Sequence, residues 1–211
     1  GLDNPVVPLS QGCALTVLKG NLCPNGAVMK SSAAKPELRQ HCGPALVLDT
    51  HQALSEQIDH PDLDITGDTV LILRNAGPVG APGMPEWGNL PIPKKLLQQG
   101  VTDMVRISDA RMSGTHYGTC ILHVAPEAAV GGPLALVKTG DMIELDIAAG
   151  TLNMQVSDAE LATRRAALQP SHPVYGRSYA ALYQQHVTQA NEGCDFDFLQ
   201  SGSDVPEPPI Y

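Results

Sequence analysis

Two polar segments hold most of the side chains in this sequence that could do chemistry, and each follows an apolar run. Residues 75–87 are rich in glycine and proline and end near a carboxylate, Glu86. Residues 108–119 place hydroxyl groups, Arg111 and His116 around Ser113. In an open α/β sheet, ligands bind just beyond the carboxyl ends of the strands. The two segments therefore predict a binding site at such an edge, although segments of this composition also serve as plain connections.

Common phosphate-binding and nucleophile motifs are absent from both segments. Neither contains Gly-x-x-x-x-Gly-Lys-Ser/Thr, and residues 112–114 lack the first glycine of a Gly-x-Ser-x-Gly elbow. A hydrolase with Ser113 as nucleophile and His116 or His123 as base is a weak hypothesis. His116 lies close to Ser113 in sequence, and no buried third member of a triad is identifiable. His123 lies in an apolar run, which predicts a core histidine.

Composition and charge exclude several classes of protein. The 211 residues are enough for a sizeable core, and a net charge of -9 argues against a nucleic-acid partner. No apolar run approaches the roughly 20 residues of a membrane span, and no signal peptide is visible, so we expect a cytoplasmic protein. No Cys-x-x-Cys pair occurs, which predicts reduced thiols at all five cysteines: Cys13, Cys23, Cys42, Cys120 and Cys194.

The hydrophobic pattern predicts one α/β domain at residues 1–192 and an acidic, proline-rich tail at 193–211. Helices are expected at 50–58, 91–99, 157–167 and 177–191, with Thr50 and Ser157 as N-caps. Residues 134–138 and 142–147 are expected to form a hairpin around 139–141. Further apolar runs predict strands at 14–19, 27–30, 46–48, 69–74, 104–107, 121–124 and 151–156.

Five segments, in order along the chain, resemble the carboxy-terminal domain of the dihydroxy-acid and phosphogluconate dehydratase family. They are Gly-Asn-Leu-Cys-Pro-Asn-Gly-Ala-Val-Met-Lys at 20–30, His-Cys-Gly-Pro-Ala at 41–45, Gly-Met-Pro-Glu at 83–86, Asp-Ala-Arg-Met-Ser-Gly-Thr at 109–115 and His-Val-Ala-Pro-Glu-Ala-Ala-Val-Gly-Gly-Pro-Leu-Ala-Leu-Val at 123–137. Residues 109–115 are more similar to the sugar-acid branch than to the Asp-Gly-Arg-Phe-Ser-Gly of branched-chain biosynthesis. Arabinonate, xylonate or gluconate is the favoured substrate class.

The resemblance implies a swivelling β/β/α-type α/β domain with a mixed, partly closed barrel-like sheet and flanking helices. It also implies elimination of water from a 2,3-dihydroxy acid to give a 2-keto-3-deoxy acid. Ser113 matches the base, Thr115 a residue that assists it, and Glu86 a magnesium ligand. Arg111 and His116 are candidate substrate contacts, and a loop-bracing salt bridge is the alternative for Arg111.

The rest of the family's site lies outside this sequence. The resemblance implies a two-iron two-sulfur cluster whose ligands belong to an amino-terminal domain, and none of the five cysteines here matches them. We therefore expect the isolated chain to be inactive, and the full-length enzyme to be a homo-oligomer, either a dimer or a tetramer. The alternative is a stand-alone binding or assembly module, or a separate small subunit, that reuses the fold.

Overall fold

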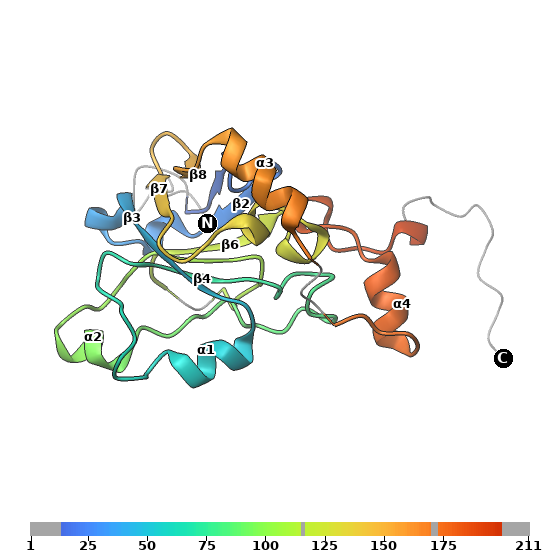
Figure 1. Ribbon diagram of the computed structural model, residues 1–211, viewed down its shortest axis with the longest axis horizontal. Coiled ribbons are helices and arrows are strands. Elements are labelled where there is room, and N and C mark those ends of the chain that lie inside the picture. The colour runs from blue at the N-terminus through green and yellow to red at the C-terminus, as the bar shows by residue number, and fades with distance from the viewer. Residues whose placement is uncertain (1–13, 115–116, 170–172, 200–211) are drawn as a thin grey trace, which may run out of the picture.

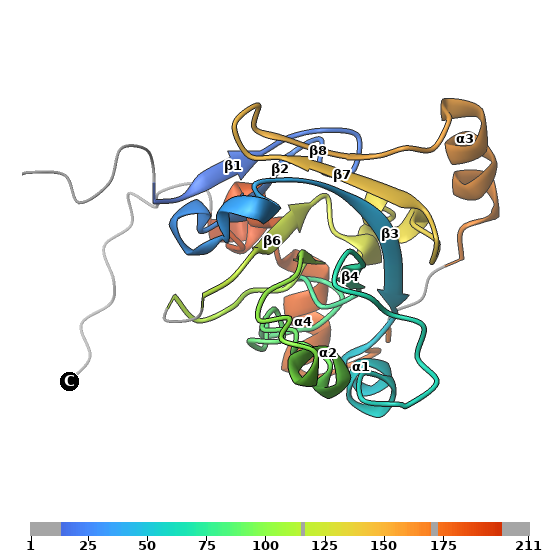
Figure 2. The same cartoon turned by 90° about the vertical axis from the view of Figure 1, so that its left-hand side faces the viewer.

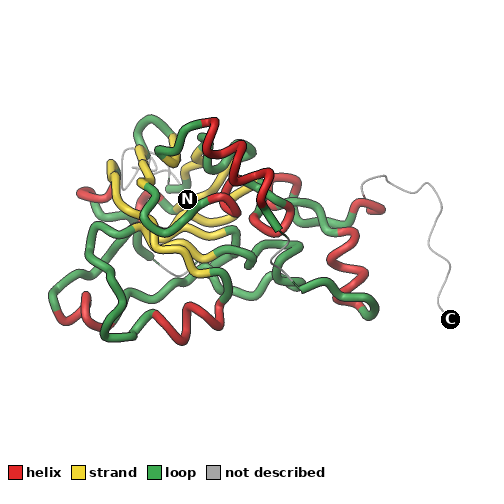
Figure 3. The backbone as a smooth tube through the Cα atoms, in the orientation of Figure 1, coloured by secondary structure: helices red, strands yellow, loops and turns green. Residues whose placement is uncertain are grey.

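In the part of the chain that the structure describes, eight β-strands form one mixed sheet at the centre (Figures 1 and 3). The computed structural model describes residues 14–114, 117–169 and 173–199. The strand order is β1-β2-β6-β5-β4-β3-β7-β8, in which β3, β4, β5 and β6 are parallel and the other pairings are antiparallel. The strands are β1 Thr16–Leu18, β2 Gly26–Met29, β3 Gln40–Leu48, β4 Val70–Leu73, β5 Arg106–Ser108, β6 Cys120–Ala125, β7 Met142–Asp146 and β8 Thr151–Met154.

The two outermost strands of this order meet each other, so the sheet is nearly closed into a barrel. Lys19, directly after β1, forms a parallel bridge with Thr151 at the start of β8. The Lys19 N–H donates to the Gly150 carbonyl at 2.9 Å, and the Leu152 N–H donates to the Lys19 carbonyl at 3.0 Å. The predicted α/β class, with a mixed and partly closed barrel-like sheet, is confirmed.

Four α-helices flank the sheet in the described residues: α1 His51–Gln57, α2 Lys94–Gln98, α3 Asp158–Ala167 and α4 Tyr179–His186. Figures 1 and 2 place α1 and α2 together on one side and α3 on the opposite side, near β7 and β8. In Figure 1, α4 stands apart from the sheet. Within these ranges, no helix combines the length and apolar composition that a bilayer span requires.

The central strand β4 divides its side chains between two cores, which explains its uninterrupted apolar sequence. Val70 and Ile72 belong to the cluster inside the barrel, whereas Leu71 and Leu73 belong to the cluster outside it. All four side chains are completely buried. Successive side chains of a strand point to opposite faces, so a strand covered on both faces must be apolar at every position.

The expected hairpin at 134–147 is wrong. Residues Pro133–Leu136 form a 3₁₀ helix, and β7 instead pairs with β8 and with β3. The carbonyls of Ala135 and Val137 accept hydrogen bonds from Arg74 Nη1, at 2.8 and 3.1 Å. This long-range contact satisfies backbone groups that strand pairing would otherwise use.

Both predicted N-caps are present, but two helices are shorter than expected. The hydroxyl of Thr50 accepts from the Ala53 N–H at 3.0 Å, and that of Ser157 accepts from the Glu160 N–H at 3.3 Å. The helix expected at 91–99 begins only at Lys94, because its N-cap, Pro93, has a non-helical backbone with ψ of 137°. The helix expected at 177–191 is reduced to α4, and Val187 pairs with Phe196 instead.

Candidate functional site

One buried carboxylate, Asp109, ties together the segments that follow three parallel strands. It lies directly after β5 and has no exposed surface. Its two oxygens accept from the N–H groups of Asn75 at 3.2 Å and Ala76 at 2.9 Å, which follow β4. They also accept from the Ala128 N–H at 2.9 Å, which follows β6. Asp109 therefore fixes the start of the 75–87 loop relative to the next two strands.

A second buried carboxylate, Glu127, holds the same loop further along. It accepts from the N–H groups of Val79 and Gly80, each at 2.9 Å. Gln189 Nε2 donates to it at 2.8 Å, and the Gln189 side-chain oxygen accepts from the Glu127 N–H at 2.9 Å. The fit is tight, since a Cβ atom on Gly77 would lie 2.6 Å from Glu127 Oε2. Packing against Glu127 thus explains why residue 77 is a glycine.

The burial of Asp109 affects its ionisation. Burial raises the pKa of the Asp109 carboxyl to about 7, against the opposing effect of hydrogen bonds from the Ala128 and Ala76 N–H groups. The charge of Glu127 adds to the rise. Between pH 3.8, the ordinary pKa of the carboxyl group, and about pH 7, Asp109 is therefore more protonated in the folded protein than in the unfolded chain. Stabilisation by Asp109 is complete below this window and is lost as the pH rises through it.

The substitution Asp109→Asn removes this ionisation and should change the pH dependence of stability. The quantity to compare is the free energy of unfolding of the unsubstituted chain minus that of Asp109→Asn. We expect this difference to be about 2–3 kcal/mol smaller at pH 8 than at pH 5. Urea unfolding at a series of pH values measures it. Asp64→Asn, at an exposed position, is the matched control and should give a constant difference. A constant difference for Asp109→Asn as well would contradict the prediction.

Arg111 connects the 75–87 loop with the 108–119 loop. Its carbonyl accepts from the Gly88 N–H at 2.8 Å, and its Nε donates to the Met84 carbonyl. Its Nη1 lies 3.6 Å from Glu86 Oε1, and both side chains are about half exposed, at 47% and 50%. The loop-bracing contacts considered for Arg111 are therefore present, and its contact with a substrate stays a prediction. The contacts bring the carboxylate of Glu86 next to the segment that carries Ser113.

Ser113 lies in a pocket of about 380 Å³ between the ends of β2 and β6. The lining comes from residues 14–15, 28–30, 112–114, 120, 122 and 123. Ser113 is half-buried there. Lys30 reaches across from the end of β2, and its Nζ donates to the Gly114 carbonyl at 3.3 Å. Thr115 and His116 lie outside the described residues.

His123 is half-buried and lines this pocket, whereas the sequence predicted a core histidine. Its backbone is left-handed, with φ of 54°, at an irregularity in the pairing of β2 with β6. Irregularities of this kind redirect side chains and are frequent beside active sites. Burial lowers the pKa of His123, and the charge of Arg111 lowers it further. We therefore expect an uncharged imidazole at neutral pH.

A complete metal site is not formed by the described part of the chain. It contains no group of three or more His, Cys, Asp or Glu side chains that could hold a metal ion. Glu86 offers one accessible carboxylate on a braced loop. Magnesium commonly takes one or two protein carboxylates together with water and substrate oxygens. Glu86 fits the part of a single ligand in a site completed by other groups.

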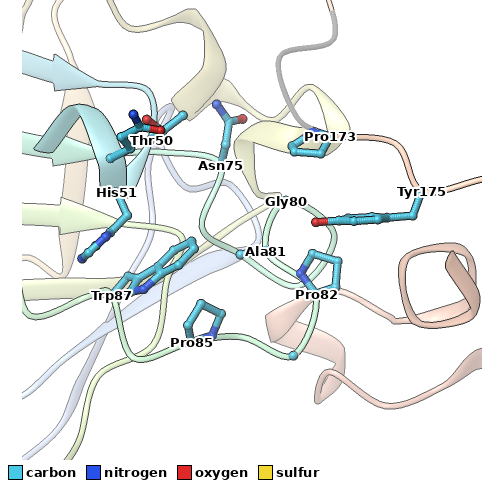
Figure 4. A pocket seen from close by; sticks show the side chains of 12 residues that line it. Thr50, His51, Asn75, Gly80, Ala81, Pro82, Pro85, Trp87, Pro173 and Tyr175 are labelled. Carbon is cyan, nitrogen blue, oxygen red and sulfur yellow. The ribbon is translucent and has the colours of Figure 1, made fainter. Parts of the chain in front are cut away.

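A second pocket, of about 560 Å³, lies at the carboxyl ends of β3 and β4 and shares the 75–87 loop (Figure 4). His51 and Trp87 stack on one side, with ring centroids 4.9 Å apart. Tyr175 and three prolines contribute to the remaining wall (Figure 4). The sequence patterns did not predict this pocket, because its walls come from three segments that lie far apart in the chain.

The family described as dihydroxy-acid/6-phosphogluconate dehydratase C-terminal matches residues 2–194. The chain is 76% identical over 210 residues to the 6-deoxy-6-sulfo-D-gluconate dehydratase of Pseudomonas putida, covering 100% of this chain and 36% of that protein. It is 53% identical over 213 residues to the L-arabonate dehydratase of Azospirillum brasilense, covering 97% of this chain and 36% of that protein. A dihydroxy-acid dehydratase of Clostridium beijerinckii is 44% identical over 191 residues, covering 90% of this chain and 34% of that protein.

The nearly closed α/β barrel, with its buried carboxylates beneath two polar loops, is thus the structure of a domain of the dihydroxy-acid/6-phosphogluconate dehydratase C-terminal type. The chain belongs to the dihydroxy-acid/6-phosphogluconate dehydratase family. It spans about a third of the length of the curated relatives that it matches.

Proposed function

We propose that this chain is the carboxy-terminal part of a hydro-lyase that dehydrates a 2,3-dihydroxy sugar acid to a 2-keto-3-deoxy acid. The observation that carries the proposal is the contact made by Arg111, which joins the Glu86 loop to the segment of Ser113. A base and a metal-binding carboxylate on adjoining loops are what this elimination requires. The similarity to the Pseudomonas putida relative makes 6-deoxy-6-sulfo-D-gluconate the first substrate to test.

The roles of the residues follow from the reaction. Ser113, as an alkoxide, takes the proton from carbon 2 of the substrate and then gives it to the hydroxyl group of carbon 3, which departs as water and leaves Ser113 as the alkoxide again. The enol that remains tautomerises to the 2-keto-3-deoxy acid. Thr115 is proposed to hydrogen-bond the substrate or assist Ser113, and Arg111 and His116 to contact the substrate. When bound, magnesium and a two-iron two-sulfur cluster would supply the Lewis acidity that helps the hydroxyl group to leave.

Glu86 is the proposed magnesium ligand from this chain. Arg111 Nη1 lies 3.6 Å from Glu86 Oε1, so a cation bound by Glu86 would have to be accommodated beside this guanidinium. The remaining ligands, and those of the cluster, are proposed to come from an amino-terminal domain. The isolated chain would then bind no cluster and would not turn over.

A chimera provides the test. The carboxy-terminal part of the Pseudomonas putida dehydratase that aligns with this chain is replaced by the chain, with its 76% identity, and the product is called the chimera below. We expect the chimera to release a keto acid from 6-deoxy-6-sulfo-D-gluconate, L-arabonate or D-gluconate, measured as the semicarbazone. The isolated chain, assayed alongside, should release none. A folded chimera that acts on no sugar acid would contradict the proposal and favour a binding or assembly module.

A further inference from the structure

Lys30 places its ammonium group beside the turn that carries Ser113. It follows β2 directly, is half-buried, and lines the same pocket as Ser113. Its Nζ donates to the carbonyl of Gly114, the residue after Ser113, at 3.3 Å. The 84 residues that separate the two in sequence are bridged by the pairing of β2 with β6. A positive charge is therefore built into the wall of the Ser113 pocket.

Apart from Lys30, the ionisable groups that line this pocket are uncharged at neutral pH in the described residues. Burial lowers the pKa of His123, which leaves its imidazole neutral. Burial raises the pKa of Cys120, so the thiol stays protonated. Arg111, on the same loop as Ser113, faces Glu86 at 3.6 Å. Among the described residues that line the pocket, Lys30 is the one lysine or arginine.

A serine hydroxyl is a very weak acid, so its use as a base requires nearby positive charge. An opposite charge within about 4–6 Å favours the ionised form of a group, and the effect is large where water is partly excluded. We propose that Lys30 is a positioning residue for Ser113: its ammonium fixes the Ser113–Gly114 turn and stabilises the Ser113 alkoxide. This role rests on the proposed function of Ser113 as the base.

The chimera with Lys30→Met tests the inference through its pH profile. Removal of the cation raises the pKa of Ser113, so the acid limb of kcat/KM should move to higher pH by about one to two units. At neutral pH, kcat/KM should fall by about 10–100-fold, and raising the pH should restore part of it. Lys30→Arg keeps the charge and should restore most of the activity and the original position of the limb.

Lys35→Met is the matched control. Lys35 is half-buried like Lys30, lies five residues further on, faces Glu37 at 3.8 Å, and does not line the pocket. Its pH profile should be that of the unsubstituted chimera. A fall in kcat/KM of Lys30→Met that is equal at every pH, or that Lys30→Arg does not reverse, would overturn the proposed role of Lys30. It would leave the proposed function of the chain untouched. An inactive unsubstituted chimera would overturn the proposed function and this inference with it.

Discussion

The substitution Ser113→Ala in the chimera should lower kcat by at least about a thousandfold, with KM changed much less. The methyl group cannot take the proton from carbon 2, whereas Lys30 binds the carbonyl of Gly114 and the 75–87 loop is held by Asp109 and Glu127. The loss therefore belongs to the chemical step. Steady-state kinetics on the best sugar acid measure it, and circular dichroism and the thermal midpoint confirm that the variant folds.

Ser55→Ala supplies the matched control for this experiment. Ser55 is an exposed residue of α1, and its hydroxyl donates to the His51 carbonyl at 3.0 Å within the same helix. Its substitution should leave kcat within about twofold of the unsubstituted value, as is typical of surface changes remote from a site. Turnover by Ser113→Ala at a similar level would remove Ser113 from the role of base.

The substitution Asp103→Ala should lower the free energy of unfolding by about 3–5 kcal/mol. Asp103 is 7% exposed and pairs with Arg106 at 3.0 Å. It also accepts from the Met104 N–H at 3.0 Å and from the Thr119 N–H and hydroxyl at 3.0 and 2.8 Å. Its loss leaves a buried guanidinium without its carboxylate, and Arg106 Nε already has no hydrogen-bond partner in the described part of the chain.

Urea unfolding of the isolated chain measures this effect. Asp62→Ala, at an exposed position, should change the midpoint little. The double variant Asp103→Ala with Arg106→Met should recover part of the stability, because it removes the unpaired charge as well. A loss below about 1 kcal/mol for Asp103→Ala would show that the pair contributes little to holding the base of the 108–119 loop.

Much of the fold could be predicted where a local pattern decides the structure. The apolar run of β4 is unbroken because the strand separates two cores, and Thr50 and Ser157 cap helices through contacts within four residues. Prediction failed where distant residues decide. Residues 134–138 have the composition of a strand, but Arg74 binds their carbonyls from about 60 residues away.

In the candidate site, too, some residues could be found from local sequence motifs and others could not. Glu86 and Ser113 were found through motifs, and their catalytic roles stay predictions. The supporting carboxylates Asp109 and Glu127 lie within two of the five motifs but were not assigned a role, because most of their partners are backbone N–H groups, which carry no sequence signal. An acidic residue directly after an apolar strand and next to a glycine-rich loop is the signal that could have found them.

The closure of the barrel limits how copies of this domain can associate. A strand at the edge of an open sheet exposes unpaired backbone groups, to which a strand from another chain can add. Here the bridge between Lys19 and Thr151 links the two outermost strands, so the described sheet has little free edge to offer. Assembly through the described sheet is therefore expected to use side-chain surfaces and loops, and a peptide that joins by extending this sheet is disfavoured.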